Sequence, residues 1–181
     1  MAAEVWNAIF AGLTLVVFVV TAIAAFVQLR HLRVSNSLNG LITILEDWQK
    51  PELQRWVHFT RYELPQKLKD DAYFAQIASL QSLNREEHPW LHVCDYYEQL
   101  GAIVKYGMID SQALLDVGCG TITSLWRAVW PALEARRRGI DNEALCENFE
   151  YLAVLCQNWL DRYPRGAYPR GTPRWPDVAK G

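Results

Sequence analysis

The sequence has little net charge and few cysteines. Its 18 Lys and Arg residues nearly balance 20 Asp and Glu residues, for a formal charge of −2 at pH 7. A chain so close to neutrality lacks the broad basic surface of nucleic-acid-binding proteins, so we expect no nucleic-acid partner. No two of the four cysteines form a CxxC pair, and we expect reduced core thiols rather than a disulfide framework. These are Cys94, Cys119, Cys146 and Cys156.

Strand-like patterns and catalytic motifs are also missing. No segment shows the sustained apolar and polar alternation of a half-buried strand, so the predicted fold class is all-α. No GxSxG nucleophile elbow occurs, and we assign no catalytic residue and no cofactor. Apolar residues instead recur at spacings of three and four in successive segments. These predict helices over residues 38–48, 51–64, 70–83, 89–107, 111–117, 123–138 and 142–162.

Residues that favour helix ends mark several of these boundaries. We expect Asp70 or Asp71, Asp110 and Asp141 to act as N-caps, and Gly107 to form a left-handed C-terminal cap. Pro65 should stop the second helix, whereas Pro131 should either begin a new turn or kink its helix. The sequence therefore predicts a multi-helix bundle.

No Lys or Arg precedes Arg30, and most of the segment before it is apolar. Residues 8–27 carry no charge, and Thr14 and Thr21 are their only mildly polar members. About 20 such residues let a helix cross the hydrocarbon layer, so we predict a transmembrane anchor over residues 1–29. A cleaved signal peptide is the alternative. The small residues 22–24 fit its cleavage site, but the Lys- and Arg-free start and the length of the apolar segment do not fit it.

The charges that flank the apolar segment predict its orientation. Arg30, His31 and Arg33 follow it, while Glu4 lies on the other side. The positive-inside rule then leaves the N-terminus outside and a helical domain, residues 30–162, in the cytoplasm. Trp6, Arg30 and Arg33 are expected at the membrane interfaces.

Two small residues of the apolar segment suggest a partner in the bilayer. Ala8 and Gly12 form a small-xxx-small pair, which would let another transmembrane helix approach closely. Besides the lipid bilayer, the expected partners are therefore other membrane proteins.

The stretch "LLDVGCGTI", residues 114–122, looks like the glycine-rich turn of a nucleotide- or cofactor-binding fold. Ile122 stands where that motif has its third glycine, and the following residues have a helical pattern instead of a strand that ends in an acid. We therefore interpret the two glycines as a break between helices.

Histidines and glutamates are the remaining candidates for chemistry. His88 and His92 are four residues apart and could reach one metal ion from a helix, but capping and surface roles fit their context better, and we predict no metal site. Glu98, Glu147 and Glu150 could form a carboxylate cluster. Salt bridges to Lys105, Arg127 or Arg136 are favoured, because histidines at the offsets of a di-metal site are lacking.

The last 19 residues, 163–181, differ from the rest in their density of Pro, Gly and Arg. "YPRG" occurs twice, which disfavours helix and favours extended chain with turns. This segment is either a frayed tail or an ordered arm that docks on a partner or on its own domain. The docking residues would be Tyr163, Tyr168, Arg170, Arg174 and Trp175.

The phrases "DYYEQLGAIVKYGMID", "ENFEYLA" and "YPRGTPR" carry a resemblance. On them the chain is similar, from about residue 29 onward, to a bacterial family of single-spanning membrane proteins with a domain of unknown function. The resemblance implies a helical fold and a bacterial inner-membrane location, and it brings no catalytic residues. The function we expect is that of an accessory or scaffolding subunit. The alternative is a membrane-tethered metal-dependent enzyme or a stress or signalling effector.

The orientation can be tested with reporter fusions at the C-terminus. We expect alkaline phosphatase to be inactive there and a cytoplasmic fluorescent reporter to be active, because Arg30 and Arg33 should hold their flank inside. A phosphatase fusion that is active only in the periplasm contradicts this topology.

Overall fold

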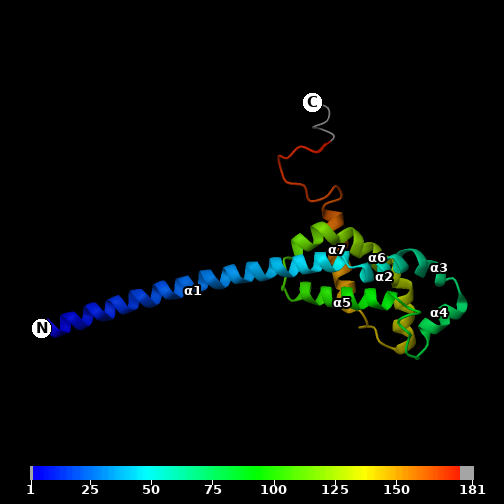
Figure 1. Ribbon diagram of the computed structural model, residues 1–181, viewed down its shortest axis with the longest axis horizontal. Coiled ribbons are helices and arrows are strands. Elements are labelled where there is room, and N and C mark those ends of the chain that lie inside the picture. The colour runs from blue at the N-terminus through cyan, green and yellow to red at the C-terminus, as the bar shows by residue number, and fades with distance from the viewer. Residues whose placement is uncertain (1, 176–181) are drawn as a thin grey trace. The chain divides into compact units, whose positions relative to one another are not determined.

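The computed structural model describes residues 2–175, apart from the side chains of Ala2, Glu4 and Ala8, and within this range its regular structure is helical, as predicted (Figure 1). The elements are α1 (Ala2–Gln49), α2 (Pro51–His58), the π-helix η1 (Phe59–Glu63), α3 (Leu64–Lys67), α4 (Asp71–Ala78), α5 (Trp90–Lys105), α6 (Ser111–Ile140) and α7 (Glu147–Arg162). The chain divides into two units, residues 1–40 and residues 41–181.

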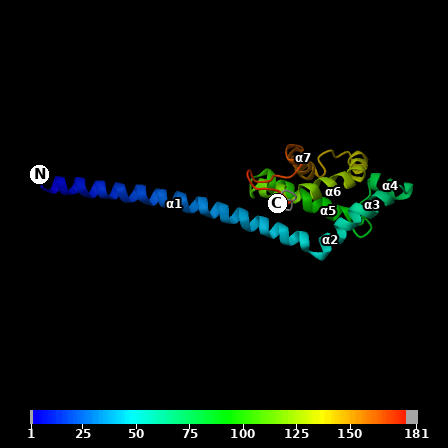
Figure 2. The same ribbon diagram turned by 90° about the horizontal axis from the view of Figure 1, so that it is seen from above.

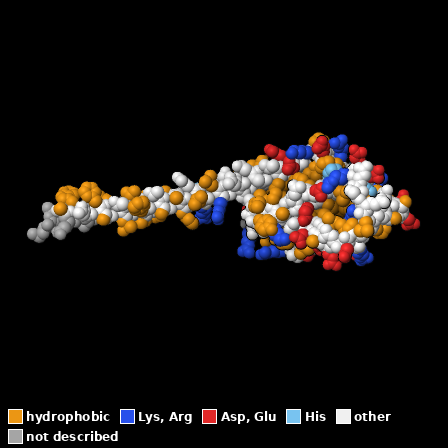
Figure 3. Space-filling view, turned by 90° about the horizontal axis from the view of Figure 1, so that it is seen from below, with side chains coloured by type: hydrophobic (Ala, Val, Ile, Leu, Met, Phe, Trp, Pro, Cys, Tyr) orange, Lys and Arg blue, Asp and Glu red, His pale blue; other side chains and the backbone are white. Residues whose placement is uncertain are grey.

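The first unit is the apolar part of α1. This helix contains an 18-residue window of mean hydropathy 2.6 with no buried residue, and Figure 3 shows apolar side chains exposed along it. The hydroxyls of Thr14 and Thr21 donate to the carbonyls of Phe10 and Val17 at 2.8 and 2.7 Å, so these polar groups find partners inside the helix. By length and composition the helix can cross a membrane, although a signal sequence near an N-terminus has the same properties.

The second unit has its core where α5, α6 and α7 pack on one another, which both ribbon views show (Figures 1 and 2). Large fully buried side chains come from all three helices, among them Trp90, Tyr97, Leu125 and Phe149. The rings of Tyr97 and Phe149 stack with their centroids 5.1 Å apart. The last turns of α1 belong to this unit, since Ile44 is buried in the same core.

Several helix ends follow their predicted local chemistry. The carboxylate of Asp70 accepts from the amides of Ala72 and Tyr73 at the start of α4. Asp110 caps α6 in the same way. Gly107 has a positive φ of 65° after α5, so its predicted left-handed conformation is confirmed.

The predicted break at the "GCG" motif is wrong, because α6 continues through both glycines and through Pro131. A Cβ on Gly118 would lie 2.4 Å from Cη2 of Trp48. Gly118 therefore makes room for an indole from α1, and the motif serves packing between helices.

Three other boundaries differ from the prediction. The helix that begins at Asp71 ends at Ala78 instead of near residue 83. Asp141 ends α6 in a left-handed conformation with φ 51° instead of capping the last helix, which begins at Glu147. Pro65 does not stop the second helical segment, because η1 widens the turn before it and α3 continues the helix to Lys67.

The contact of α5 with α7 generates a stability prediction. A Cβ at Gly101 would lie 2.0 Å from the carbonyl oxygen of Asn148, whereas a Cβ at Gly120 would meet nothing within 4 Å. We expect Gly101→Ala to lower the free energy of unfolding by about 1–3 kcal/mol through overpacking. Gly120→Ala is the matched control and should raise it by up to about 1 kcal/mol through helix propensity. Urea unfolding followed by tryptophan fluorescence measures both, and equal effects of the two substitutions contradict the prediction.

Candidate functional site

The arm that follows α7 folds back on itself. The Arg174 guanidinium donates to the carbonyl of Arg165 at 2.6 Å and lies 4.7 Å from the centroid of the Tyr168 ring. The Tyr168 hydroxyl donates to the carbonyl of Pro173 at 3.3 Å. Gly166 and Gly171 have positive φ values of 80° and 79°, which non-glycine residues rarely adopt. These local contacts shape residues 163–175 into a loop, and Arg174 is one of the residues that hold it.

The aromatic residues of the arm have different surroundings. Tyr163 is half-buried, with its ring 4.7 Å from that of Trp159 on α7 and beneath the guanidinium of Arg162. Tyr168 is 48 % exposed and Trp175 is 77 % exposed, and Arg170 is exposed as well. Tyr163 thus attaches the arm to its own domain, while Tyr168, Arg170 and Trp175 present accessible surface.

The residues predicted to contact the membrane lie on α1. Trp6, Arg30 and Arg33 are exposed, and the ring of Trp6 lies 6.3 Å from that of Phe10. A Cβ on Gly12 would meet nothing within 4 Å, whereas the side chain of Ala8 lies outside the described residues. Membrane contact and helix pairing at this face stay predictions.

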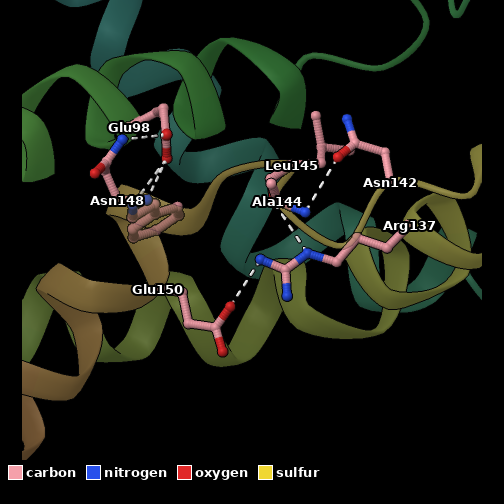
Figure 4. A network of polar contacts seen from close by, with 8 residues as sticks. Glu98, Arg137, Asn142, Ala144, Leu145, Asn148 and Glu150 are labelled. Carbon is pink, nitrogen blue, oxygen red and sulfur yellow. Dashed lines mark hydrogen bonds and ion pairs between the residues drawn. The ribbon is translucent and has the colours of Figure 1, made fainter.

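A network of polar contacts holds the loop between α6 and α7 (Figure 4). The Arg137 guanidinium donates to the carbonyl of Leu145 at 2.9 Å and to the Glu150 carboxylate at 2.7 Å. It also lies over the ring of Trp130, 5.6 Å from the centroid. Asn142 accepts from the amide of Ala144 at 3.1 Å.

Glu98 of α5 caps α7 from outside that helix. One of its carboxylate oxygens accepts from the amides of Asn148 and Phe149, both at 2.9 Å, and the other accepts from the Asn148 side chain at 2.7 Å (Figure 4). The first amides of a helix have no partner within it, and an acceptor there also meets the positive end of the helix dipole. Cys146, just before α7, has a left-handed φ of 59° and offers no side-chain cap.

The three glutamates predicted as a cluster or as salt-bridge partners therefore have separate roles. Glu98 is a helix cap, while Glu147 pairs with Lys105 at 3.6 Å, as one of the predicted alternatives required. Glu150 pairs with Arg137, which the sequence analysis did not name. The two predicted arginines bind elsewhere. Arg127 donates to Gln157, and Arg136 donates to carbonyls at the end of α4 and just after it, those of Ile77, Ser79 and Gln81.

A groove of about 650 Å³ lies beside the Arg137 network. Its lining residues are Trp130, Glu134, Arg137, Arg138, Asp141, Glu143 and Glu150. A hollow of about 300 Å³ adjoins it through Trp130 and Glu150 and also contacts Trp126, whose ring lies 5.6 Å from that of Trp130. The four carboxylates of the groove outnumber its two guanidinium groups, which pair with Glu134 and Glu150. Carboxylates beside aromatic faces favour basic groups.

The two histidines considered for a metal site face different aromatic partners. His88 is 1 % exposed and its ring lies 4.7 Å from that of Tyr73. Burial lowers the pKa of His88; the negative charge of Glu87 partly opposes this effect, and the positive charges of Lys67 and Arg136 add to it. His92 stacks on Trp56 at 4.2 Å. Among the described residues, no three His, Cys, Asp or Glu side chains are grouped as metal ligands.

All four cysteines are buried and free, as the prediction of core thiols required. A hydrogen bond with Cys146 and complete burial raise the pKa of Cys94 well above its usual value. Burial raises the pKa of Cys156 to about 12. The thiols of Cys94 and Cys156 are therefore protonated at neutral pH and poorly nucleophilic.

Trp126, Trp130 and Arg137 lie together on a surface that was not predicted from the sequence. Their signal is the helical spacing: the two tryptophans are four positions apart, and Arg137 follows Trp130 after two turns. The partners that Arg137 meets beyond α6 depend on the tertiary fold.

Together these features define a helical domain joined to one apolar helix, with a shaped aromatic arm and an acidic groove. The chain belongs to the DUF4760 family, a domain of unknown function, whose family model matches residues 15–159. The match begins within the apolar part of α1 and ends within α7, so the arm lies outside it. Comparison with curated proteins and with solved structures finds no match.

The cap of α7 generates a second stability prediction. Glu98→Gln replaces one of the two acceptor oxygens with an NH₂ group, which would face N–H groups of Asn148 or Phe149. We expect this substitution to lower the free energy of unfolding by about 1–3 kcal/mol. Glu86→Gln, at an exposed position outside the network, is the control and should change it by less than about 0.5 kcal/mol. Urea unfolding at pH 7 measures both variants, and a Glu98→Gln protein as stable as the control variant contradicts the capping role.

Proposed function

We propose that the protein is a membrane-anchored accessory or scaffolding subunit that binds partner proteins. In this proposal α1 spans a bacterial inner membrane with its N-terminus outside, and the helical domain presents its binding surfaces at the cytoplasmic face. The exposed apolar segment of α1 and the basic residues that follow this segment within the helix support the anchor and its direction.

The observation that carries the binding role is the combination of shape and exposure in the arm. Arg174 and Tyr168 hold the loop by contacts within it, yet Tyr168 and Trp175 keep much of their surface exposed. Trp, Tyr and Arg are the residues most enriched at the energetic centres of protein interfaces. A loop that is already shaped also loses less conformational entropy on binding than a flexible tail.

The acidic groove offers a second surface, suited to a basic segment of a partner. Its excess of carboxylates is complementary to Arg and Lys side chains. The loop that borders it is fixed by Arg137 and Asn142, so the groove has a defined shape before a partner binds.

The aromatic rings of the arm should contribute most of the affinity. Burying one such ring stabilises a complex by about 1.5–3 kcal/mol, whereas an exposed ion pair contributes at most about 1 kcal/mol. Trp175 is more exposed than Tyr168 and therefore has more aromatic surface to bury.

We test the proposal by gentle detergent extraction of the full chain and quantification of the proteins that remain bound. Trp175→Ala and Tyr168→Ala should each reduce partner recovery more than the control Arg170→Ala does, at moderate salt. Truncation after Pro164 should abolish recovery. Unchanged partner recovery and stability after this truncation contradict the arm as a binding element. Stoichiometric zinc or iron that is lost on His92→Ala supports the alternative of a metal-dependent protein.

A further inference from the structure

A small cavity of about 130 Å³ lies where the end of α1 meets α2, η1, α5 and α6. It is lined by Trp48, Leu53, Gln54, Val57, Arg61, Tyr97 and Thr121. Arg61 is the one charged residue of this lining, and no carboxylate belongs to it. The cavity is distinct from the groove beside Arg137, which shares none of these residues.

The π-helix places Arg61 at this cavity. Pro65 has no amide hydrogen to donate to the carbonyl of Arg61, so an α-helical bond is impossible at this point. The turn widens, and the amide of Leu64 bonds to the carbonyl of Phe59, five residues earlier. Such single π turns occur frequently at functional sites. Phe59 and Thr60 of this turn are buried, and Arg61 is half-buried beside them.

Two contacts fix Trp48, the residue of α1 that lines the cavity. The indole of Trp48 packs where Gly118 leaves room, and the Gln54 side chain donates to the carbonyl of Trp48. Because the space depends on a glycine in another helix, the position of Trp48 is defined by the tertiary fold. The cavity is therefore a built feature of the domain.

Arg61 differs from the half-buried Arg136 and Arg137 in its hydrogen bonding. Arg136 donates to backbone carbonyls and Arg137 to a carboxylate and a carbonyl. The Nε of Arg61 is buried and has no hydrogen-bond partner among the described residues. Leaving a buried donor of a charged group without a protein acceptor is costly for stability.

The remaining polar groups of the lining are also suited to an anion. Burial raises the pKa of Tyr97, whose hydroxyl therefore stays protonated at neutral pH and can donate. Thr121 adds a second hydroxyl and Gln54 an amide. The guanidinium of Arg61 is a planar fork of donors that matches the oxygens of phosphate or carboxylate.

We propose that this cavity binds a phosphate group, with Arg61 as the residue that pairs with its charge. A water molecule takes about 30 Å³ of liquid volume, so the cavity has room for a phosphate-sized group. The group belongs either to free phosphate or to the headgroup of a lipid.

The test uses the full chain in detergent micelles and inorganic phosphate as the probe. Phosphate should raise the midpoint of thermal unfolding of the wild-type protein in a saturable manner, since a ligand of the folded state stabilises it by mass action. In Arg61→Met the apparent Kd should increase by at least about tenfold. The control Arg55→Met, at an exposed position of α2, should respond like the wild-type protein. The absence of a saturable response in the wild-type protein, or an equal response in Arg61→Met, overturns the proposal.

A second readout separates a binding role of Arg61 from a structural one. Without phosphate, Arg61→Met should be as stable as the wild-type protein or more stable, because it removes an unpartnered buried donor. If Arg61 only braces the fold, the variant should unfold more easily in phosphate-free buffer, which also overturns the proposal.

The source of the phosphate group is determined in nanodiscs. If discs of phosphatidylglycerol or of phosphatidylcholine, which both carry a phosphate group, abolish the response to inorganic phosphate seen in micelles, the lipid headgroup occupies the site. If both retain it, free phosphate is the ligand. Either result supports the proposal when Arg61→Met removes the response, and a response that Arg61→Met retains in both discs contradicts it.

Discussion

The contact between α5 and the first turn of α7 is the constraint on which the rest of the helical domain depends. Gly101 lets the backbone of Asn148 approach closer than any side chain would allow, and Glu98, three residues earlier, accepts from the first amides of α7. Steric fit and hydrogen bonding therefore act at the same place. With α7 fixed there, Phe149 reaches the rings of Tyr97 and Trp126, and Glu150 reaches Arg137.

The loop between α6 and α7 follows from this constraint. It begins and ends with non-glycine residues in the left-handed conformation, Asp141 and Cys146. Such residues cost about 1–3 kcal/mol each and persist only where the surroundings determine them. Arg137 and Glu98 supply those surroundings from α6 and α5. The shape of the acidic groove is thus a property of three helices together.

The sequence predicted the features that local chemistry decides. Asp70, Asp110 and Gly107 act within a few residues of their own positions, and the helical periodicity identified the all-α class. Glu98 caps α7 by accepting from the amides of Asn148 and Phe149, which lie 50 and 51 positions later in the chain. A glycine is needed at position 118 because an indole from another helix packs against it. Neither can be derived from spacing along the chain. In the arm, the hydrogen bond from Arg174 to the carbonyl of Arg165 was not predicted either.

The π turn at residues 59–63 has a consequence for how the chain tolerates insertions and deletions. A π turn contains one residue more than the α turn that it replaces, and one residue corresponds to a rotation of about 100° around a helix. With one residue fewer, the residues before and after this turn would be rotated by about 100° relative to each other and would present different faces. The extra residue lets Phe59 and Thr60 be buried side by side while Leu64 still reaches the core. The length of this turn is therefore constrained as tightly as the identity of its side chains.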